Sequence, residues 1–351
     1  MSESIFHASD EFRNNAWIKT MDEYQTMYTQ SIKDPDTFWA GMANNFHWEK
    51  KWDKVREYNY HLSKGPISIK WFINGKTNIC YNCLDRHLPD RKDQTALIWE
   101  GNSEGEDLTI SYGQLHEKVC RFANALKEKG VGKGDRVAIY MPMIPELAAT
   151  MLACARIGAI HSIVFGGFSA EALADRIEDS LCKVLVTTDG VMRGAKAVPL
   201  KTAADRALTL CEERGHQVQT CFVVKRTGSD IPMKADRDIW WHDAADAQSP
   251  DCPVEWMDAE DPLFILYTSG STGKPKGVQH NVGGYMVYAG TTFKYIFDYH
   301  DGDIYWCTAD IGWVTGHSYI VYGPLSQGAT SLMFEGVPTY PDPGRFWATV
   351  D

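Results

Sequence analysis

Between about residue 81 and residue 334, short apolar runs alternate with stretches of helical periodicity. The apolar runs predict strands at residues 95–99, 136–141, 160–165, 183–188, 219–224, 263–268 and 330–334. The helical periodicity predicts helices at residues 112–129, 146–157 and 170–180. Strands that alternate with helices form a mostly parallel, doubly wound α/β sheet. Because ligands of such sheets bind beyond the carboxyl ends of the strands, we expect the site in the loops that follow them.

The first eighty or so residues differ from the rest of the chain. Aromatic residues stand among charged ones at Trp17, Tyr24, Tyr28, Phe38, Trp39, Phe46, Trp48 and Trp52. Asp34 and Pro35 predict the start of a helix just before Phe38 and Trp39. This region predicts a helical, aromatic-rich cap laid over the main domain. Further along, residues 228–260 are polar and rich in turn residues, which predicts a surface excursion.

Charge and cysteine content exclude several classes of protein. The 35 Lys and Arg against 46 Asp and Glu leave a net charge of −11, which argues against a nucleic-acid partner. An apolar stretch long enough to span a membrane is not found, and the N-terminus lacks a secretion-signal pattern. Nine scattered cysteines suit a reducing cytoplasm, and a lone CxxC at Cys80 and Cys83 without a second pair does not predict zinc.

The strongest chemical signal is a loop rich in glycine and hydroxyl side chains after the predicted strand at 263–268. Its sequence from residue 267 to residue 277 is YTSGSTGKPKG. Glycines let the backbone amides approach a ligand closely, and the hydroxyls and two lysines supply donors and positive charge. The loop does not fit the Walker pattern, because Thr268 stands where that pattern needs glycine and Pro275 follows Lys274. A simple surface turn is the alternative, and the loop's position after a buried strand argues against it.

This loop resembles the signature loop of the adenylate-forming superfamily, which includes acyl-CoA synthetases. Other stretches are similar to the acetyl-CoA synthetases in that superfamily, among them 82–87, 98–101, 151–159, 165–169 and 305–319. The resemblance covers nearly the whole chain and implies an acetyl-CoA-synthetase-type N-terminal cap at residues 1–84. It implies an AMP-binding, adenylate-forming domain at residues 85–351, of which the C-terminal part is missing.

The resemblance implies a two-step ligase reaction. Acetate attacks Mg²⁺-bound ATP to give acetyl-adenylate and diphosphate, and coenzyme A then displaces AMP to give acetyl-CoA. The phosphates of ATP would be held by Thr268, Ser269, Gly270, Ser271, Thr272, Gly273, Lys274 and Lys276. Acetate, ATP and coenzyme A are the implied partners. Propionate remains an open alternative to acetate, because one methylene changes selectivity by only ~1–3 kcal/mol.

The resemblance also implies sites for coenzyme A and for the acyl group. Coenzyme A would contact Arg193, Gly194, Ala195, Lys196 and Thr315, with Phe165, Gly166 and Gly167 lining its pantetheine tunnel. The family usually has a second arginine where Lys196 stands, so charge is kept but bidentate geometry is not. Trp313, Val314 and Thr315 would shape a small acyl pocket.

Each of these assignments has a structural alternative. Arg193 and Lys196 could be solvated surface charges, the glycines at 166 and 167 a tight turn, and Trp313 part of an aromatic core. His317 is better explained as a structural histidine than as a base. Thr339 stands where the family typically has an asparagine that contacts coenzyme A, and that role is not carried over.

By comparison with the family, the adenylation lysine and the mobile C-terminal domain are absent, so no catalytic residue is assigned. We expect a chain cut at Asp351 to have little ligase activity by itself. Two alternatives stay open: a non-catalytic module that binds ATP or coenzyme A, and one half of a split enzyme completed by a separate C-terminal chain.

Overall fold

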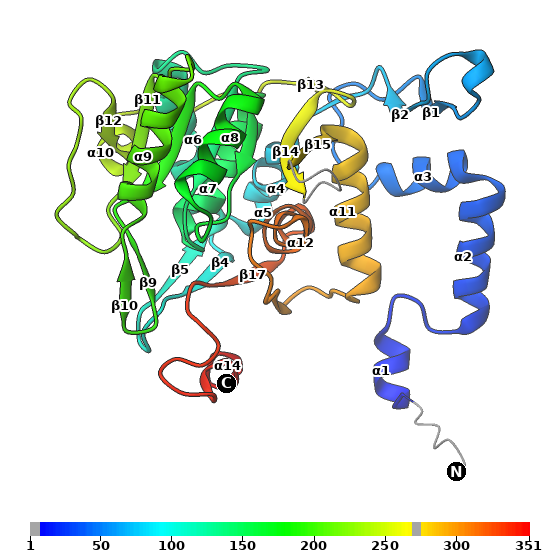
Figure 1. The fold of residues 1–351 in the computed structure, drawn as a ribbon. Helices are drawn as coiled ribbons and strands as arrows, with labels where there is room; N and C mark the ends of the chain where they lie inside the picture. The colour runs from blue at the N-terminus through cyan, green and yellow to red at the C-terminus, as the bar shows by residue number, and fades with distance from the viewer. Residues whose placement is uncertain (1–7, 269–274) are drawn as a thin grey trace, which may run out of the picture.

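The computed structural model describes residues 8–268 and 275–351. Its main sheet has the strand order β12-β11-β8-β6-β7-β14-β15. Strands β11 and β12 lie toward one end of the sheet, and β14 and β15 lie at the other (Figure 1). The neighbours from β12 to β14 pair in parallel, and β15 returns antiparallel along β14. In chain order these strands are β6 (Arg136–Tyr140), β7 (Ile160–Ile163), β8 (Val184–Thr188), β11 (Thr220–Val224), β12 (Asp238–Trp240), β14 (Pro262–Thr268) and β15 (Lys276–Asn281).

Helices cover both faces of this sheet. Val137 and Ile139 of β6 pack into one core with helices α6 and α7. The intervening Ala138 and Tyr140 pack into a second core with α8 and α9. The bounds are α6 (Tyr112–Glu128), α7 (Pro145–Arg156), α8 (Ala170–Ser180) and α9 (Leu200–Glu213). Because strand side chains alternate between faces, burial of both sets is the mark of a doubly wound sheet, and that prediction is confirmed.

The predicted elements agree with the observed ones to within about two residues at most ends. Helix α8 has the predicted bounds, and α6 ends before Gly130, which adopts a left-handed φ of 76°. Pro145 is the first residue of α7, where its missing N–H costs nothing. Strand β7 stops at Ile163, two residues before the predicted end.

The prediction of a surface excursion at residues 228–260 is wrong in part. Strand β12 pairs in parallel with β11, and α10 (Trp241–Asp246) follows it directly. Trp241 is 1% exposed and stacks on Phe122, with 4.6 Å between ring centroids. The segment also contains β13 (Met257–Asp258), paired with β3. Strands of two or three residues are too short to leave a periodicity in the sequence.

A second sheet has the strand order β16-β17-β4-β5. Strands β16, β17 and β4 pair in parallel, and β5 pairs antiparallel with β4. Its strands are β4 (Thr95–Glu100), β5 (Asp107–Ser111), β16 (Ile304–Trp306) and β17 (Thr330–Phe334). The helical elements in this part of the chain are α11 (Val282–Ile296), α12 (Val314–Gly316), the π-helical segment η3 (His317–Tyr322), α13 (Gly323–Ser326) and α14 (Arg345–Val350). A short hairpin of β9 (Val191–Arg193) and β10 (Lys196–Val198) leaves the main sheet after β8.

The cap is helical at first and then forms an antiparallel hairpin. Its elements are α1 (Asp10–Asn15), α2 (Met21–Lys33), α3 (Pro35–Ala43), β1 (Lys54–Asn59), η1 (Leu62–Lys64), β2 (Ser68–Ile73), β3 (Lys76–Thr77) and α4 (Ile79–Cys83), followed by η2 (Asp85–His87) and α5 (Leu88–Arg91). Asp34 caps α3 as predicted, since its side chain accepts from the Thr37 amide at 3.2 Å. Helices α1 and α2 bury no residue, so this part of the cap stands beside the main domain more than over it (Figure 1).

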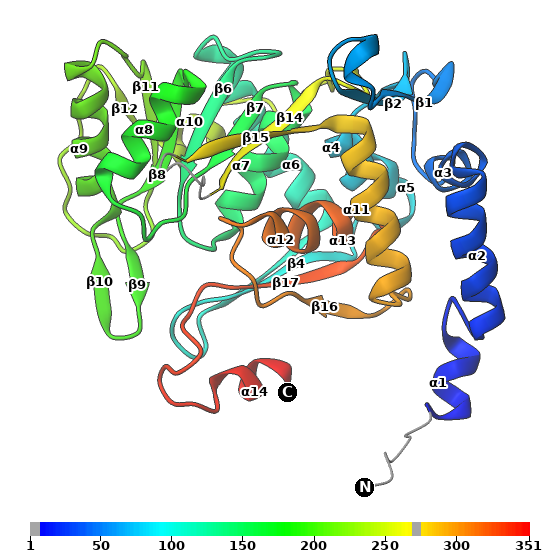
Figure 2. The same cartoon turned by 45° about the vertical axis from the view of Figure 1, so that its right-hand side comes forward.

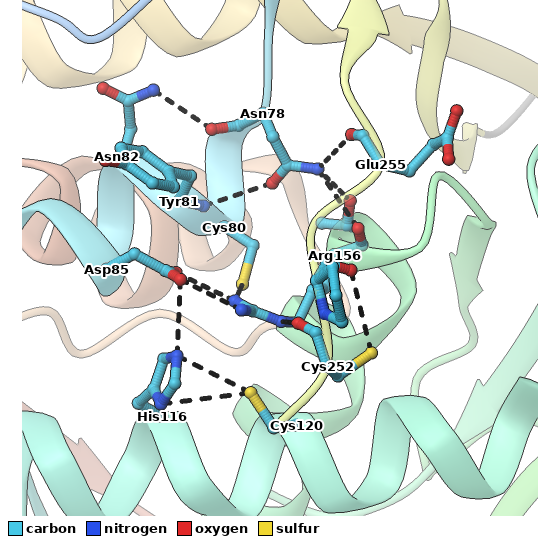
Figure 3. A network of polar contacts seen from close by, with 12 residues as sticks. Asn78, Cys80, Tyr81, Asn82, Asp85, His116, Cys120, Arg156, Cys252 and Glu255 are labelled. Atoms are coloured by element: carbon cyan, nitrogen blue, oxygen red, sulfur yellow. Dashed lines mark hydrogen bonds and ion pairs between the residues drawn. The ribbon is translucent and has the colours of Figure 1, made fainter. Parts of the chain in front are cut away.

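A buried polar network joins the cap to the main domain (Figure 3). Asp85 receives two hydrogen bonds from Arg156 of α7, at 2.8 and 2.9 Å, and lies 3.3 Å from His116 of α6. Asn78 donates to the carbonyls of Ala155 and Glu255, each at 2.8 Å. The network fixes the start of α4 against the end of α7, and Asp85 against His116 of α6.

All nine cysteines lie in the described residues, and each is a free thiol. Eight of them are buried. Among residues 8–268 and 275–351, the helices are too short or too polar for any of them to cross a bilayer.

Candidate functional site at the carboxyl ends of the two sheets

The loops that follow strands of both sheets converge on the hairpin β9–β10. Asn102, two residues after β4, bonds to Gly194 at the tip of this hairpin. Glu335, directly after β17, pairs with Arg226 of the loop that follows β11, at 2.9 Å. Carboxyl ends of parallel strands are where ligands of such folds bind. In Figure 2 the hairpin and α12 both lie below the main sheet, on the same side.

Gly194 and Ala195 form the two-residue turn of that hairpin, between the paired residues Arg193 and Lys196. Gly194 adopts a φ of 62°, in the left-handed region that favours glycine. Gly194 is buried, whereas Ala195 and Lys196 are exposed. The two cations therefore sit side by side on a fixed backbone, which is an arrangement suited to phosphate oxygens.

Arg193 lies beside the loop after β7. Its guanidinium carbon is 5.9 Å from the centroid of the Phe165 ring. Phe165 in turn packs against Gly312, in the segment that leads to α12. A Cβ atom added to Gly312 would lie 3.1 Å from the Phe165 Cβ. The structure thus brings Phe165 close to Arg193 of the hairpin and to Gly312, which directly precedes residues 313–315.

The glycines at 166 and 167 belong to a tight turn. The Phe168 amide donates to the Phe165 carbonyl at 2.9 Å, and the Tyr140 hydroxyl donates to the carbonyls of Gly166 and Phe168. The strand-to-helix turn is therefore real. Whether the turn also borders pantetheine stays a prediction.

The residues assigned to the acyl pocket are exposed. Trp313 is 54% exposed and Val314 is 42% exposed, and Thr315 is exposed as well. Trp313 precedes α12 and its amide donates to the Asp310 carbonyl at 3.1 Å. The aromatic-core alternative for Trp313 is wrong, since a core tryptophan would be shielded from solvent.

Two carboxyl groups, that of the half-buried Asp310 and that of the buried Glu335, lie close to Arg193. Burial raises the pKa of Asp310, although the Gly312 amide, 2.7 Å from its Oδ1, and the charge of Arg193 oppose the rise. Burial raises the pKa of Glu335 to about 7, against the opposing charge of Arg226. Glu335 thus titrates near neutral pH. It belongs to a network in which Arg226 also forms an ion pair with Glu106, at 2.8 Å.

The loop predicted to bind phosphate connects β14 and β15. Thr268 ends β14 and Lys276 begins β15; the two are paired and exposed. The other predicted phosphate contacts, at residues 269–274, lie outside the described residues. The loop leaves the same carboxyl edge of the sheet as the loop after β7, because β14 and β7 are parallel.

A cavity of about 390 Å³ lies beside the ends of this loop. It is lined by Asp175, Arg176, Glu178, Asp179, Tyr267 and Pro275. The Tyr267 hydroxyl donates to Asp179 at 2.5 Å, and Arg176 stacks on the Tyr267 ring at 5.5 Å. Among the described residues, three carboxylates and one arginine line this cavity.

His317 behaves as a buried structural histidine. Burial lowers its pKa to about 4, and its Nδ1–H donates to the Trp313 carbonyl at 3.0 Å. Its ring packs on Phe264 of β14, 4.6 Å between centroids. Among the described residues its Nε2 has no hydrogen-bond partner. The residue links α12 to the sheet and is neutral at physiological pH.

Sequence reasoning missed several polar residues that shape this region. They are Asn102, Asp189, Arg226, Asp310, Glu335 and Tyr340. Four of them follow the carboxyl end of a strand within two residues: Asn102 after β4, Asp189 after β8, Arg226 after β11 and Glu335 after β17. A polar residue in that position was the signal that could have found them. Thr339, next to Tyr340, is exposed.

Comparisons with known proteins identify the family. The sequence model described as AMP-binding enzyme matches residues 84–351, and the one described as acetyl-coenzyme A synthetase N-terminus matches residues 24–83. The chain is 57% identical over 351 residues to acetyl-coenzyme A synthetase of Desulfatibacillum aliphaticivorans, covering 100% of this chain and 53% of that protein. It is 58% identical over 348 residues to that of Alkalilimnicola ehrlichii, and 60% identical over 331 residues to that of Magnetococcus marinus. These matches cover 99% and 94% of this chain, and 53% and 50% of those two proteins.

The chain thus spans about half the length of the curated relatives it matches. Its two matched regions follow one another in the order that the resemblance implied. The chain belongs to the AMP-binding enzyme family and carries the N-terminal region that marks the acetyl-coenzyme A synthetases within it.

Proposed function

We propose that this chain contributes the phosphate loop and the coenzyme A entrance of an acetate–CoA ligase. In the proposed reaction, a carboxylate oxygen of acetate attacks the α-phosphorus of ATP, and diphosphate leaves. The thiol of coenzyme A then attacks the acyl carbon of acetyl-adenylate, and AMP leaves. The names of the relatives support this reaction, as does the convergence of the named segments on one edge of the fold.

The residues of this chain would act by binding and positioning. Thr268 and Lys276 flank the loop that would hold the β- and γ-phosphates of ATP. Arg193 and Lys196 would bind phosphate groups of coenzyme A. Trp313, exposed beside Gly312 and Phe165, would border a small acyl group. Phosphoryl transfer of this kind depends on charge neutralisation and positioning, which such residues supply.

Magnesium would enter with ATP as part of the substrate. The described residues contain no group of three His, Cys, Asp or Glu side chains that could hold a metal ion.

We further propose a cytoplasmic location, which the buried free thiols support, since such thiols persist in reducing compartments. A separate complementary chain is a second proposed partner. The observation behind it is that the chain covers only about half of its relatives' length.

The observation that carries the proposal is the meeting of Arg193, Phe165 and Gly312 at the carboxyl ends of the strands. Two substitutions test it by calorimetric titration of the chain with ATP and with coenzyme A. Arg193→Ala should weaken coenzyme A binding by about tenfold or more, because one charge-assisted contact is lost, and leave ATP affinity unchanged. Lys276→Ala should show the reverse pattern.

Arg206→Ala is the matched control, because Arg206 is a half-exposed arginine on α9 whose only ion pair, with Glu213, is 3.8 Å long in the part of the chain that the structure describes. It should change neither affinity. Equal loss of both ligands in all three variants would contradict the assignment of separate ATP and coenzyme A contacts.

A further inference from the structure

Asn102 holds the tip of the hairpin β9–β10 through both halves of its amide. Its Nδ2 donates to the Gly194 carbonyl at 3.0 Å, and its Oδ1 accepts from the Gly194 amide at 2.9 Å. Asn102 is 0% exposed and lies 92 residues before Gly194 in the sequence. A buried side chain that satisfies both polar groups of one distant residue fixes its position in two directions.

The hairpin needs such a tether. It contains three residue pairs, and two-stranded ribbons of this size are marginally stable by themselves. On the other side of the tip, the Tyr340 ring packs against Gly194, where an added Cβ atom would come within 3.3 Å of it. The tip is therefore held between Asn102 and Tyr340.

The tether acts directly on the two cations of the turn. Arg193 precedes Gly194 in the chain, and Lys196 is the residue paired with Arg193. A shift of the Gly194 peptide would move the Arg193 guanidinium away from Phe165, Asp310 and Glu335, its neighbours in the site. Asn102 thus controls where both charges stand.

We propose that Asn102 is a positioning residue for coenzyme A, which places the Arg193–Lys196 turn to receive the phosphates of the coenzyme. The inference rests on the proposed function and deepens its coenzyme A site. Asn102 itself need not touch the ligand. Removing it should lower affinity because binding would then have to order the turn.

Two variants grade the effect. Asn102→Ala removes both hydrogen bonds to Gly194. Asn102→Asp keeps the shape and the acceptor for the Gly194 amide, but sets a carboxylate oxygen against the Gly194 carbonyl. Asn82→Ala is the matched control. Asn82 is a 0% exposed asparagine of the cap, and its amide bonds to His47, Thr77 and Asn78.

The test combines hydrogen exchange of the peptide covering residues 191–198 with calorimetric titration of coenzyme A and ATP. Asn102→Ala should speed exchange in this peptide and weaken coenzyme A binding about tenfold, with ATP affinity within about twofold of the parent. Asn102→Asp should show both effects in the same direction. Asn82→Ala should show neither, even if it lowers the melting temperature.

Three outcomes would overturn the inference. They are unchanged exchange of residues 191–198 in Asn102→Ala, faster exchange without loss of coenzyme A affinity, and an equal loss of affinity in Asn82→Ala. A parent chain that binds no coenzyme A contradicts the proposed function itself. The exchange data still report in that case whether Asn102 orders the turn.

Discussion

At the scale of single residues, Asp85 shows how one buried carboxylate can serve two cations. Burial opposes its charge, yet the hydrogen bonds from His116 and Arg156 hold the pKa of Asp85 below its usual value. The bond to Asp85 is also the main cause that raises the pKa of His116 to about 9. Arg156 is 3% exposed and forms an ion pair with the same carboxylate.

This arrangement predicts a loss of stability in alkaline solution. The pKa of His116 is about 9 in the folded chain and ~6.5 in an unfolded one. Its contribution to the free energy of unfolding should therefore be complete below about pH 6.5 and disappear as the pH rises through about 9. Urea unfolding of the parent at about pH 6 and about pH 9.5 measures the decline.

His116→Gln keeps a hydrogen-bond donor near Asp85 without a titrating ring, so its decline should be smaller than that of the parent. His242→Gln, at a 42% exposed side chain on α10, should decline as the parent does. If His116→Gln loses as much stability as the parent over this range, the Asp85–His116 bond is not the cause.

At the scale of elements, periodicity predicted the long ones and missed the short ones. Helix α6 and strand β17 leave a clear pattern because many of their residues face a core. Strand β12 and helix α10 did not, because three and six residues contain too few repeats. Their position comes from tertiary pairing with β11 and from the burial of Trp241, which no local pattern encodes.

The first cap helices depend on one anchor, which gives a prediction of local stability. The Trp17 indole donates to the Tyr299 carbonyl at 2.7 Å, and the Lys294 ammonium lies 3.9 Å from the Trp17 ring centroid. Because α1 and α2 bury no residue, Trp17→Ala should release residues 8–33 while global stability falls by only about 1 kcal/mol. Limited proteolysis and urea unfolding measure the two effects.

Tyr24→Ala is the control, since Tyr24 is 49% exposed on α2 and its ring stacks on Tyr28 of the same helix. Cleavage within residues 8–33 should stay slow in this variant. Equal cleavage of the two variants would show that the Trp17 contacts do not hold the cap.

At the scale of the whole molecule, the sequence predicted candidate segments for the site but not how they meet. The loop at 267–277 could be named from its glycine, hydroxyl and lysine content, whereas the turn at 193–196 was named from the family resemblance. Their common edge follows from parallel strands, which the alternation of elements predicted. The contacts of Asn102 with Gly194 and of Glu335 with Arg226 join two different sheets, and sheet-to-sheet contacts leave no trace in local sequence.

The claim on which the account depends is that ATP and coenzyme A approach this chain from the carboxyl ends of its strands. A crystal structure of the chain with a non-hydrolysable ATP analogue and coenzyme A tests it most directly. We predict a phosphate oxygen of coenzyme A within hydrogen-bonding distance of the Arg193 guanidinium, and the triphosphate beside Thr268 and Lys276. Coenzyme A bound away from the turn of β9–β10, or a triphosphate away from the β14–β15 connection, would contradict the account.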